Sequence, residues 1–284
     1  MRFATIDHER LAAELLGVSV GELRARALAG SLELPQGYDA AARRLERGEP
    51  LQYVVGRAAF RRLQLKIGPG AFIPRPETEV VAGAAIDALM AWPEGRRLAV
   101  DLGAGAGPIA AALATEVPGA RVVAVERAWA AAGQARDNLE PLGVAVVNAD
   151  VGAAVAAGGP LAGLVGRVAV VAANPPYLRP DAELGPGVAE HEPPAALFGG
   201  GEDGLAAPLA FLAAAARLLR PGGTAVMEHD PSQSAALRRH AQAEGLFEDA
   251  RTGRDLAGRE RYLLATRTAG AGRSGRGAVE SPGC

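Results

Sequence analysis

Residues 97–126 read RLAVDLGAGAGPIAAALATEVPGARVVAVE, which is a β-branched run, a glycine-rich turn, an alanine-rich run and a second β-branched run. Short strands that alternate with helical runs are typical of βαβ units. The alternation continues through AAAGQARDNLEPLG (130–143), VAVVNAD (144–150) and VAVVAANPPY (168–177). The sequence therefore predicts an α/β fold built on a parallel sheet.

Four polar residues end the predicted strands at a regular spacing. Asp101, Glu126, Asp150 and Asn174 follow one another at intervals of 25, 24 and 24 residues. The carboxyl ends of the strands in an open α/β sheet lie along one edge, and ligands bind in the crevice there. We expect these four side chains to meet at one crevice.

The residues before this sheet predict a small helical domain and a hairpin. Apolar residues recur at helical spacing from about residue 7 to residue 47, which predicts a helical domain over residues 1–55. Residues 60–67 alternate in polarity and end at a Gly-Pro-Gly turn before an extended run at 71–73, so a β-hairpin is expected in a linker over residues 56–73. A helix is expected from Pro76 to about Met90, because proline suits the first helical turn.

The predicted larger domain, which contains the sheet, covers residues 74–268. Its last part should contain helices at 205–219 and 232–243, a strand at 224–228, and extended runs at 246–251 and 261–266. The loop between the last two runs is too short for a crossover helix, so those strands should be antiparallel. Residues 269–284 are low in complexity and are expected to be disordered.

Composition limits the classes of function. The 284 residues carry a net charge of −2, so no global basic field favours stable nucleic-acid binding. The apolar runs are shorter than the roughly 18 residues of a membrane span, and the N-terminus lacks the order of a secretory signal. A single cysteine, Cys284, and four scattered histidines argue against a metal site, and surface or capping roles are expected for His191, His229 and Asp230. We expect a cytoplasmic, metal-independent protein.

The glycine-rich turn suits a nucleotide-like ligand. In DLGAGAG (101–107) the glycines allow a tight turn and a close approach of the backbone to a ligand. An ordinary turn, a dinucleotide site and an S-adenosylmethionine site all fit this motif. Glu126 is placed to accept hydrogen bonds from ribose hydroxyls in either cofactor. Asp150 is expected to accept from an adenine amino group with Val151 against the ring, and a helix N-cap is the alternative role for Asp150.

The segment Asn174-Pro175-Pro176-Tyr177 favours methyl transfer to a planar nitrogen. Stiff prolines would hold the Asn174 side chain and the Pro175 carbonyl as two acceptors for one NH₂ group. That grip would present a weakly nucleophilic amide nitrogen to an activated methyl group. Tyr177 is expected to pack against the substrate plane. A rigid turn after a buried strand is the alternative interpretation.

With these motifs in view, residues 44–267 resemble the protein N5-glutamine methyltransferases that modify the GGQ motif of bacterial peptide-chain release factors. The resemblance rests on DLGAGAG, NPPY, RRLERGEPLQYVVG (43–56), GPGAFIPRPETE (68–79), EHEPPAALFGGGEDGL (190–205), LRPGGTAVMEH (219–229) and DLAGRERYLLATR (255–267). It implies a Rossmann-like seven-strand class I methyltransferase sheet, with S-adenosylmethionine as cofactor and S-adenosylhomocysteine as product. It also implies that the helical domain docks the release factor and that the glutamine enters at residues 174–177.

The resemblance assigns roles by position. The cofactor site would comprise Asp101, Gly103, Ala104, Gly105, Ala106, Gly107, Glu126, Asp150, Val151 and Asn174. The substrate site would comprise Asn174, Pro175, Pro176, Tyr177, Phe72 and Arg75, with Ile73 and Pro74 as further walls and Glu77 as an ordering residue.

Some residues depart from the usual pattern of this family. Ala104 and Ala106 replace hydroxyl residues, Glu126 replaces aspartate, Val151 replaces an aromatic residue, and Asp230 replaces glycine. The first four changes affect contacts to the cofactor, while the last puts a local turn in doubt. Three alternatives stay open: glutamine methylation of a ribosomal protein, methylation of nucleic-acid exocyclic amines, and a binding module without activity.

Overall fold

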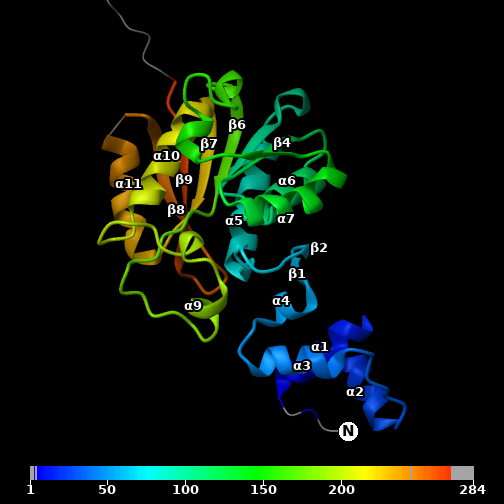
Figure 1. Cartoon of the computed structure of the whole chain (residues 1–284). Helices are drawn as coiled ribbons and strands as arrows, with labels where there is room; N and C mark the ends of the chain where they lie inside the picture. Colours follow the sequence, from blue (N-terminus) through cyan, green and yellow to red (C-terminus); the bar gives the residue numbers. More distant parts are fainter. Residues whose placement is uncertain (1–2, 4, 244, 270–284) are drawn as a thin grey trace, which may run out of the picture.

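A seven-stranded sheet forms the centre of the larger part of the protein (Figure 1). The computed structural model describes residues 3, 5–243 and 245–269, so the predicted disordered tail beyond residue 269 and Cys284 lie outside the described residues. The strands are β3 (Leu98–Leu102), β4 (Arg121–Glu126), β5 (Ala145–Asn148), β6 (Val168–Ala173), β7 (Leu219–Glu228), β8 (Phe247–Arg254) and β9 (Glu260–Arg267). The order across the sheet is β5-β4-β3-β6-β7-β9-β8. Neighbours from β5 to β7 are parallel and β9 is antiparallel to both of its neighbours, which confirms the predicted sheet and its antiparallel last pair.

Helices cover both faces of this sheet (Figure 1). The first face carries α5 (Pro76–Met90), α6 (Pro108–Glu116) and α7 (Trp129–Leu139), and the second carries α8 (Val151–Ala154), α10 (Ala206–Leu218) and α11 (Ser234–Ala243). The predicted start of α5 at a proline is confirmed. The core is rich in alanine, which lets helices such as α6 approach the sheet closely.

The strand order reverses between β3 and β6, where the chain crosses from one half of the sheet to the other. This switch point is where open α/β sheets form their ligand crevice. Asp101 lies at the end of β3 and Asn174 follows β6, so these two residues flank the switch point. Glu126 ends β4 as predicted, but β5 ends before Asp150 because that residue already caps α8.

A smaller helical part precedes the sheet and lies apart from it in Figure 1. It contains α1 (Ile6–Leu16), α2 (Val20–Leu28), α3 (Tyr38–Glu46) and α4 (Leu51–Val55). Leu11 and Leu23 are completely buried in its two small clusters. The predicted helical character of this part is confirmed, whereas its limits as a domain at residues 1–55 stay a prediction.

The hairpin between the two parts turns earlier than predicted. It consists of β1 (Arg57–Phe60) and β2 (Leu63–Lys66), so the expected turn at 68–70 and the second arm at 71–73 are wrong. Arg61 adopts a left-handed φ of 53° in the actual turn. Its guanidinium donates to both oxygens of Glu116 at 2.6 and 2.7 Å and to the Glu79 carbonyl at 3.0 Å. These contacts from distant helices hold a conformation that local sequence does not favour.

Short elements complete the connections. The loop after β6 contains α9 (Val188–His191) and the 3₁₀ turn η4 (Pro194–Ala196). The other 3₁₀ turns are η1 (Glu94–Arg96), η2 (Glu140–Leu142), η3 (Ala162–Leu164) and η5 (Pro231–Gln233). β7 begins at Leu219, earlier than the predicted start at 224, and its pairing with β6 shifts register between Val168 and Val170.

Candidate active site

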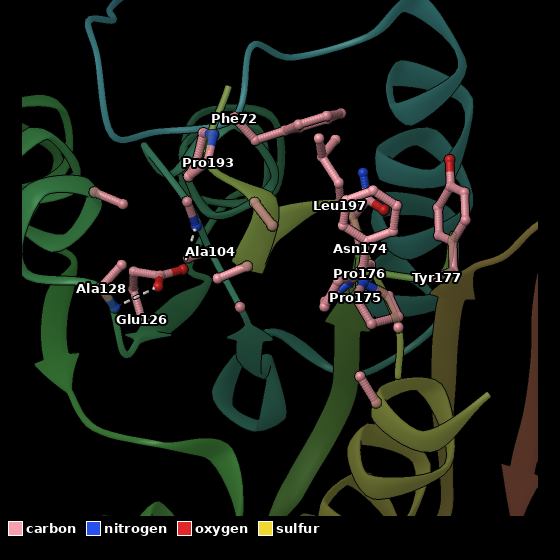
Figure 2. A pocket seen from close by; sticks show the side chains of 18 of the residues that line it. Phe72, Ala104, Glu126, Ala128, Asn174, Pro175, Pro176, Tyr177, Pro193 and Leu197 are labelled. Carbon is pink, nitrogen blue, oxygen red and sulfur yellow. Dashed lines mark hydrogen bonds between the residues drawn. The ribbon is translucent and has the colours of Figure 1, made fainter. Parts of the chain in front are cut away.

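A cavity of about 760 Å³ opens at the carboxyl edge of the sheet, over the switch point. Its lining includes fourteen of the residues predicted for the cofactor and substrate sites: Phe72, Arg75, Asp101, Gly103, Ala104, Gly105, Ala106, Glu126, Asp150, Val151, Asn174, Pro175, Pro176 and Tyr177. Figure 2 shows Glu126 on one side of this pocket and the run from Asn174 to Tyr177 on the other. The tertiary structure thus brings together residues from Phe72 to Tyr177, which are separated by up to about a hundred positions in the sequence.

The glycine-rich turn after β3 has the backbone shape that its sequence predicts. Gly103 and Gly105 adopt left-handed φ values of 69° and 58°. A Cβ on Gly103 would lie 2.7 Å from the Phe211 ring. Gly107 is the exception among the predicted cofactor residues, because it does not line the cavity and a Cβ there would meet Leu139 at 2.8 Å. Gly107 therefore allows α6 and α7 to pack closely, as small residues do.

Asp101 is a buried acidic residue, and one of its two carboxyl oxygens lacks a hydrogen-bond partner among the described residues. Its side chain lies at the cavity with the residue only 1% exposed, and Oδ2 accepts a hydrogen bond from the Ala110 amide at 2.9 Å. Oδ1 is buried and has no hydrogen-bond partner among the described residues. Burial, with a smaller contribution from nearby Glu126, raises the pKa of Asp101 to about 8. A cationic or N–H donor of a ligand would favour the ionised form of this carboxyl group and would give Oδ1 the partner that it lacks.

Glu126 orders the backbone around the cavity. Its Oε2 accepts from the Gly105 amide at 2.9 Å and its Oε1 from the Ala128 amide at 2.7 Å (Figure 2). A carboxylate has about four acceptor positions, so two remain after these bonds. The side chain can therefore hold the glycine turn and still accept from the hydroxyls of a ligand.

Asp150 is an N-cap, which was the alternative interpretation of this residue. Its Oδ1 accepts from the amides of Gly152 at 2.9 Å and Ala153 at 3.3 Å, at the start of α8. The residue also lines the cavity, and its neighbour Val151 is buried there. The cap holds the side chain at the pocket edge, so capping does not remove it from the site.

The run from Asn174 to Tyr177 is held by the loop behind it. The amides of Tyr177 and Leu178 both donate to the Leu197 carbonyl, at 3.1 and 2.9 Å. The Gln233 side chain donates to the Tyr177 carbonyl at 2.9 Å. Asp230 caps η5 and its amide donates to the Gln233 side chain at 3.3 Å, so the unusual Asp230 preserves the local turn. Capping by Asp230 is confirmed, whereas the expected surface or capping role of His229 is wrong, since that ring is completely buried.

Thr78 and Glu228, whose side chains form hydrogen bonds with predicted site residues or with each other, were missed in the sequence. The Asn174 amide nitrogen donates to the Thr78 hydroxyl at 3.2 Å, and Thr78 donates to Glu228 Oε2 at 2.8 Å. The Tyr177 hydroxyl donates to Glu228 Oε1 at 3.1 Å. Glu228 was detectable, because it ends a strand at the same sheet edge as Asp101 and Glu126. Thr78 lies in a helix, and no local pattern marks it.

Most of the remaining predicted substrate residues lie at the cavity. Phe72 and Pro74 line the cavity, and the Arg75 guanidinium lies 4.7 Å from the centre of the Phe72 ring. Arg75 also forms an ion pair with the buried carboxylate of Glu192. Ile73 is instead a core residue whose amide donates to Glu192 at 3.2 Å, so its prediction as a wall of the site is wrong. Glu77 pairs with Arg259 at 3.1 Å.

The described residues contain neither a candidate metal centre nor a candidate membrane span. Across residues 3, 5–243 and 245–269, no group of three or more His, Cys, Asp and Glu side chains is suited to hold a metal ion. In the same described ranges, no helix is long and apolar enough to cross a membrane.

Parts of this chain are similar to known methyltransferases. Residues 85–189 match the family model of the methyltransferase small domain. The solved protein-(glutamine-N5) methyltransferase (release factor-specific) of Alicyclobacillus acidocaldarius aligns with a TM-score of 0.39 and 27% identity, over 72% of this chain and 99% of that one. The sheet order, the glycine turn at its switch point and the family match define a Rossmann-like class I methyltransferase. The predicted fold class and enzyme class are confirmed.

The sequence relatives are more specific. The chain is 43% identical to the release factor glutamine methyltransferase of Mycolicibacterium smegmatis, over 93% of this chain and 91% of the relative. It is 39% identical to the 4-amino-L-phenylalanine/4-methylamino-L-phenylalanine methyltransferase of Streptomyces pristinaespiralis, over 87% and 82% respectively. This chain belongs to the release factor glutamine methyltransferase family, as its motifs predicted.

Proposed function

We propose that this protein transfers a methyl group from S-adenosylmethionine to the side-chain amide nitrogen of the glutamine in the GGQ motif of a peptide-chain release factor. A C–N bond forms as the C–S bond breaks, the electron pair stays on sulfur in S-adenosylhomocysteine, and the amide later loses one proton. The observation that carries the proposal is the hydrogen bond from Asn174 Nδ2 to Thr78, which leaves the Asn174 carboxamide oxygen to accept from a substrate NH₂ group.

The residues on the Glu126 side fit the proposed cofactor. S-adenosylmethionine supplies an electrophilic methyl group on a sulfonium sulfur, and it also carries an ammonium group, a ribose and an adenine. The unpaired Oδ1 of Asp101 suits an ammonium donor, and Glu126 keeps acceptor positions for hydroxyls. Val151 offers an apolar surface and Asp150 an acceptor for the adenine.

The residues on the Asn174 side fit an amide. The lone pair of an amide nitrogen is delocalised, so the chain must hold that nitrogen in a reactive orientation. Asn174 Oδ1 and the Pro175 carbonyl are the proposed acceptors for its two N–H groups, and no donor among the described residues occupies the Pro175 carbonyl. Positioning and electrostatic stabilisation then replace a strong base, since the proton leaves after the nitrogen has become cationic.

The helical part is the proposed docking surface for the release factor. Residues 183–185 and Val188 line the cavity, and between them Gly187 packs against the Gly48 carbonyl. A partner seated on the helices would thus be adjacent to the pocket mouth. A protein substrate fits the net charge of −2 better than nucleic acid does, and translation termination would place the reaction in the cytoplasm.

The test combines labelled S-adenosylmethionine with a release factor that carries either GGQ or GGA. Label on the GGQ protein alone is expected. Label on both proteins, or on neither, contradicts the proposal. A third reaction with free 4-aminophenylalanine examines the substrate named for the Streptomyces relative, which also presents an NH₂ group on an sp² carbon, and preferential labelling there would reassign the substrate.

A further inference from the structure

The side chains of Asn174, Thr78, Glu228 and Tyr177 form one hydrogen-bond chain beneath the cavity. Thr78 is 2% exposed in the first turn of α5, and Glu228 is 1% exposed at the end of β7. Thr78 also lines the cavity, beside Asn174. These hydrogen bonds therefore join the Asn174 side of the cavity to the buried carboxylate of Glu228, which does not line the cavity.

The donors and acceptors in this chain allow only one arrangement of protons when Glu228 is ionised. A carboxylate accepts and does not donate. Thr78 gives its single hydroxyl proton to Glu228 Oε2, and Tyr177 gives its own to Oε1. The Thr78 oxygen is then available only as an acceptor toward Asn174, so the Asn174 group that faces it must be the NH₂.

We propose that Thr78 and Glu228 are positioning residues that fix the orientation of the Asn174 carboxamide. This inference rests on the proposed role of Asn174 in binding the substrate amide. With Nδ2 committed to Thr78, Oδ1 is the group left for the substrate. A carboxamide turned by 180° would present NH₂ to the substrate NH₂, and two donors cannot bond. The turned form is therefore inactive.

The groups around Glu228 determine whether it is ionised. They therefore determine how strongly the orientation of the Asn174 carboxamide is fixed. Burial raises the pKa of Glu228 to about 7, although the hydrogen bonds from Thr78 and Tyr177 oppose that rise. Arg261 favours the ionised form and Glu77 disfavours it. A protonated Glu228 can donate to Thr78, whose own proton is then free to turn toward Asn174. We expect methyl transfer to fall as the pH drops through about 7, because the orientation is lost.

The decisive variant is Thr78→Val, which keeps the shape of the side chain and removes the hydroxyl. We expect kcat to fall by about tenfold to a hundredfold, as for a misplaced reacting group, while the Kd for S-adenosylmethionine changes by less than about twofold. Thr78→Ser restores the hydroxyl and should recover most of the loss. Thr115→Val is the matched control, because Thr115 is a helix threonine whose hydroxyl bonds only to backbone carbonyls of α6.

The pH profile tests Glu228 separately. The kcat of the wild-type enzyme should show an inflection near pH 7, and this inflection should disappear in Glu228→Gln. Thermal unfolding of Thr78→Val and of Glu228→Gln, compared with that of wild type, shows whether each variant is folded. A folded Thr78→Val with wild-type kcat, an equal loss in Thr78→Ser, or an inflection that survives in Glu228→Gln overturns the inference.

Failure of this inference can be distinguished from failure of the proposed function. If Asn174→Ala is inactive while Thr78→Val is fully active, Asn174 binds the substrate without help from Thr78, and only the inference is lost. If Asn174→Ala methylates the GGQ glutamine normally, the proposed role of Asn174 is wrong and the inference fails with it.

Discussion

The two walls of the cavity are held in different ways. On the cofactor wall, the carboxylates of Asp101, Glu126 and Asp150 bind backbone amides that are 2 to 21 residues away in the sequence. On the amide wall, Asn174 bonds to Thr78 across 96 residues, and Thr78 bonds to Glu228 across 150 residues. The first wall is built from the turns and the first helical residues that follow its own strands. The second depends on side chains that only the complete fold brings together.

This difference predicts different consequences of mutation. Damage to the cofactor wall should loosen a loop and weaken cofactor binding. Damage to the amide wall should slow methyl transfer and leave the cofactor bound.

The largest effect is expected for Asn174→Ala. Removing the proposed acceptor of the substrate amide should lower kcat by about a thousandfold, the upper range for loss of one stabilising hydrogen-bond group in a transition state. The Kd for S-adenosylmethionine, measured by calorimetry, should stay within about threefold of wild type. Loss of cofactor binding would instead make Asn174 a cofactor ligand and would break the distinction between the walls.

Glu126→Ala should produce the opposite result. The variant leaves the Gly105 and Ala128 amides without their acceptor and removes the proposed ribose contacts. The Kd for S-adenosylmethionine should rise by about a hundredfold, which corresponds to two hydrogen bonds to a charged group. The kcat at saturating cofactor should change little. Glu140→Ala, at an exposed glutamate, is the control and should bind cofactor normally.

Glu228→Gln should change how stability depends on pH. The pKa of Glu228 is raised from 4.5 to about 7 in the folded protein, so its stabilising contribution is complete below about pH 4.5 and is lost as the pH rises through about 7. Glutamine does not titrate. The free energy of unfolding of the variant, relative to wild type, should therefore rise by about 3 kcal/mol between about pH 4 and about pH 8.

Urea unfolding at several pH values measures this change. The control is Glu248→Gln, an exposed glutamate in β8, which should show little pH-dependent difference from wild type. A constant difference between Glu228→Gln and wild type across the same range would mean that Glu228 titrates normally in the folded protein.

The smallest effect is expected for Asp137→Ala, which lies on neither wall. Its ion pair with Lys66 spans 3.4 Å between two exposed side chains. Exposed pairs contribute little, so the free energy of unfolding should stay within about 0.5 kcal/mol of wild type, with unchanged methylation. A large effect on kcat would show that contacts between the hairpin and α7 also influence methyl transfer. The division of the site into a cofactor wall and an amide wall would then be incomplete.

Local sequence was enough to predict which strand-end residues meet at the cavity. Strand-end positions and glycine patterns identified Asp101, Glu126 and Asn174, and each of them lines the cavity. The same patterns could not show that Gly107 faces Leu139 or that the hairpin turns at Arg61, since both depend on contacts with distant helices.

The sequence alone determined the alternation of strands and helices, the glycine turn and the acids at the sheet edge, because each follows from hydrophobic pattern and backbone conformation over a few residues. Only the tertiary structure decided the buried chain from Asn174 through Thr78 to Glu228, and with it which end of the Asn174 carboxamide faces the cavity. The orientation of the Asn174 carboxamide depends on Thr78, whose hydroxyl proton is already donated to Glu228. Thr78 reaches both residues because helix α5 packs against the sheet.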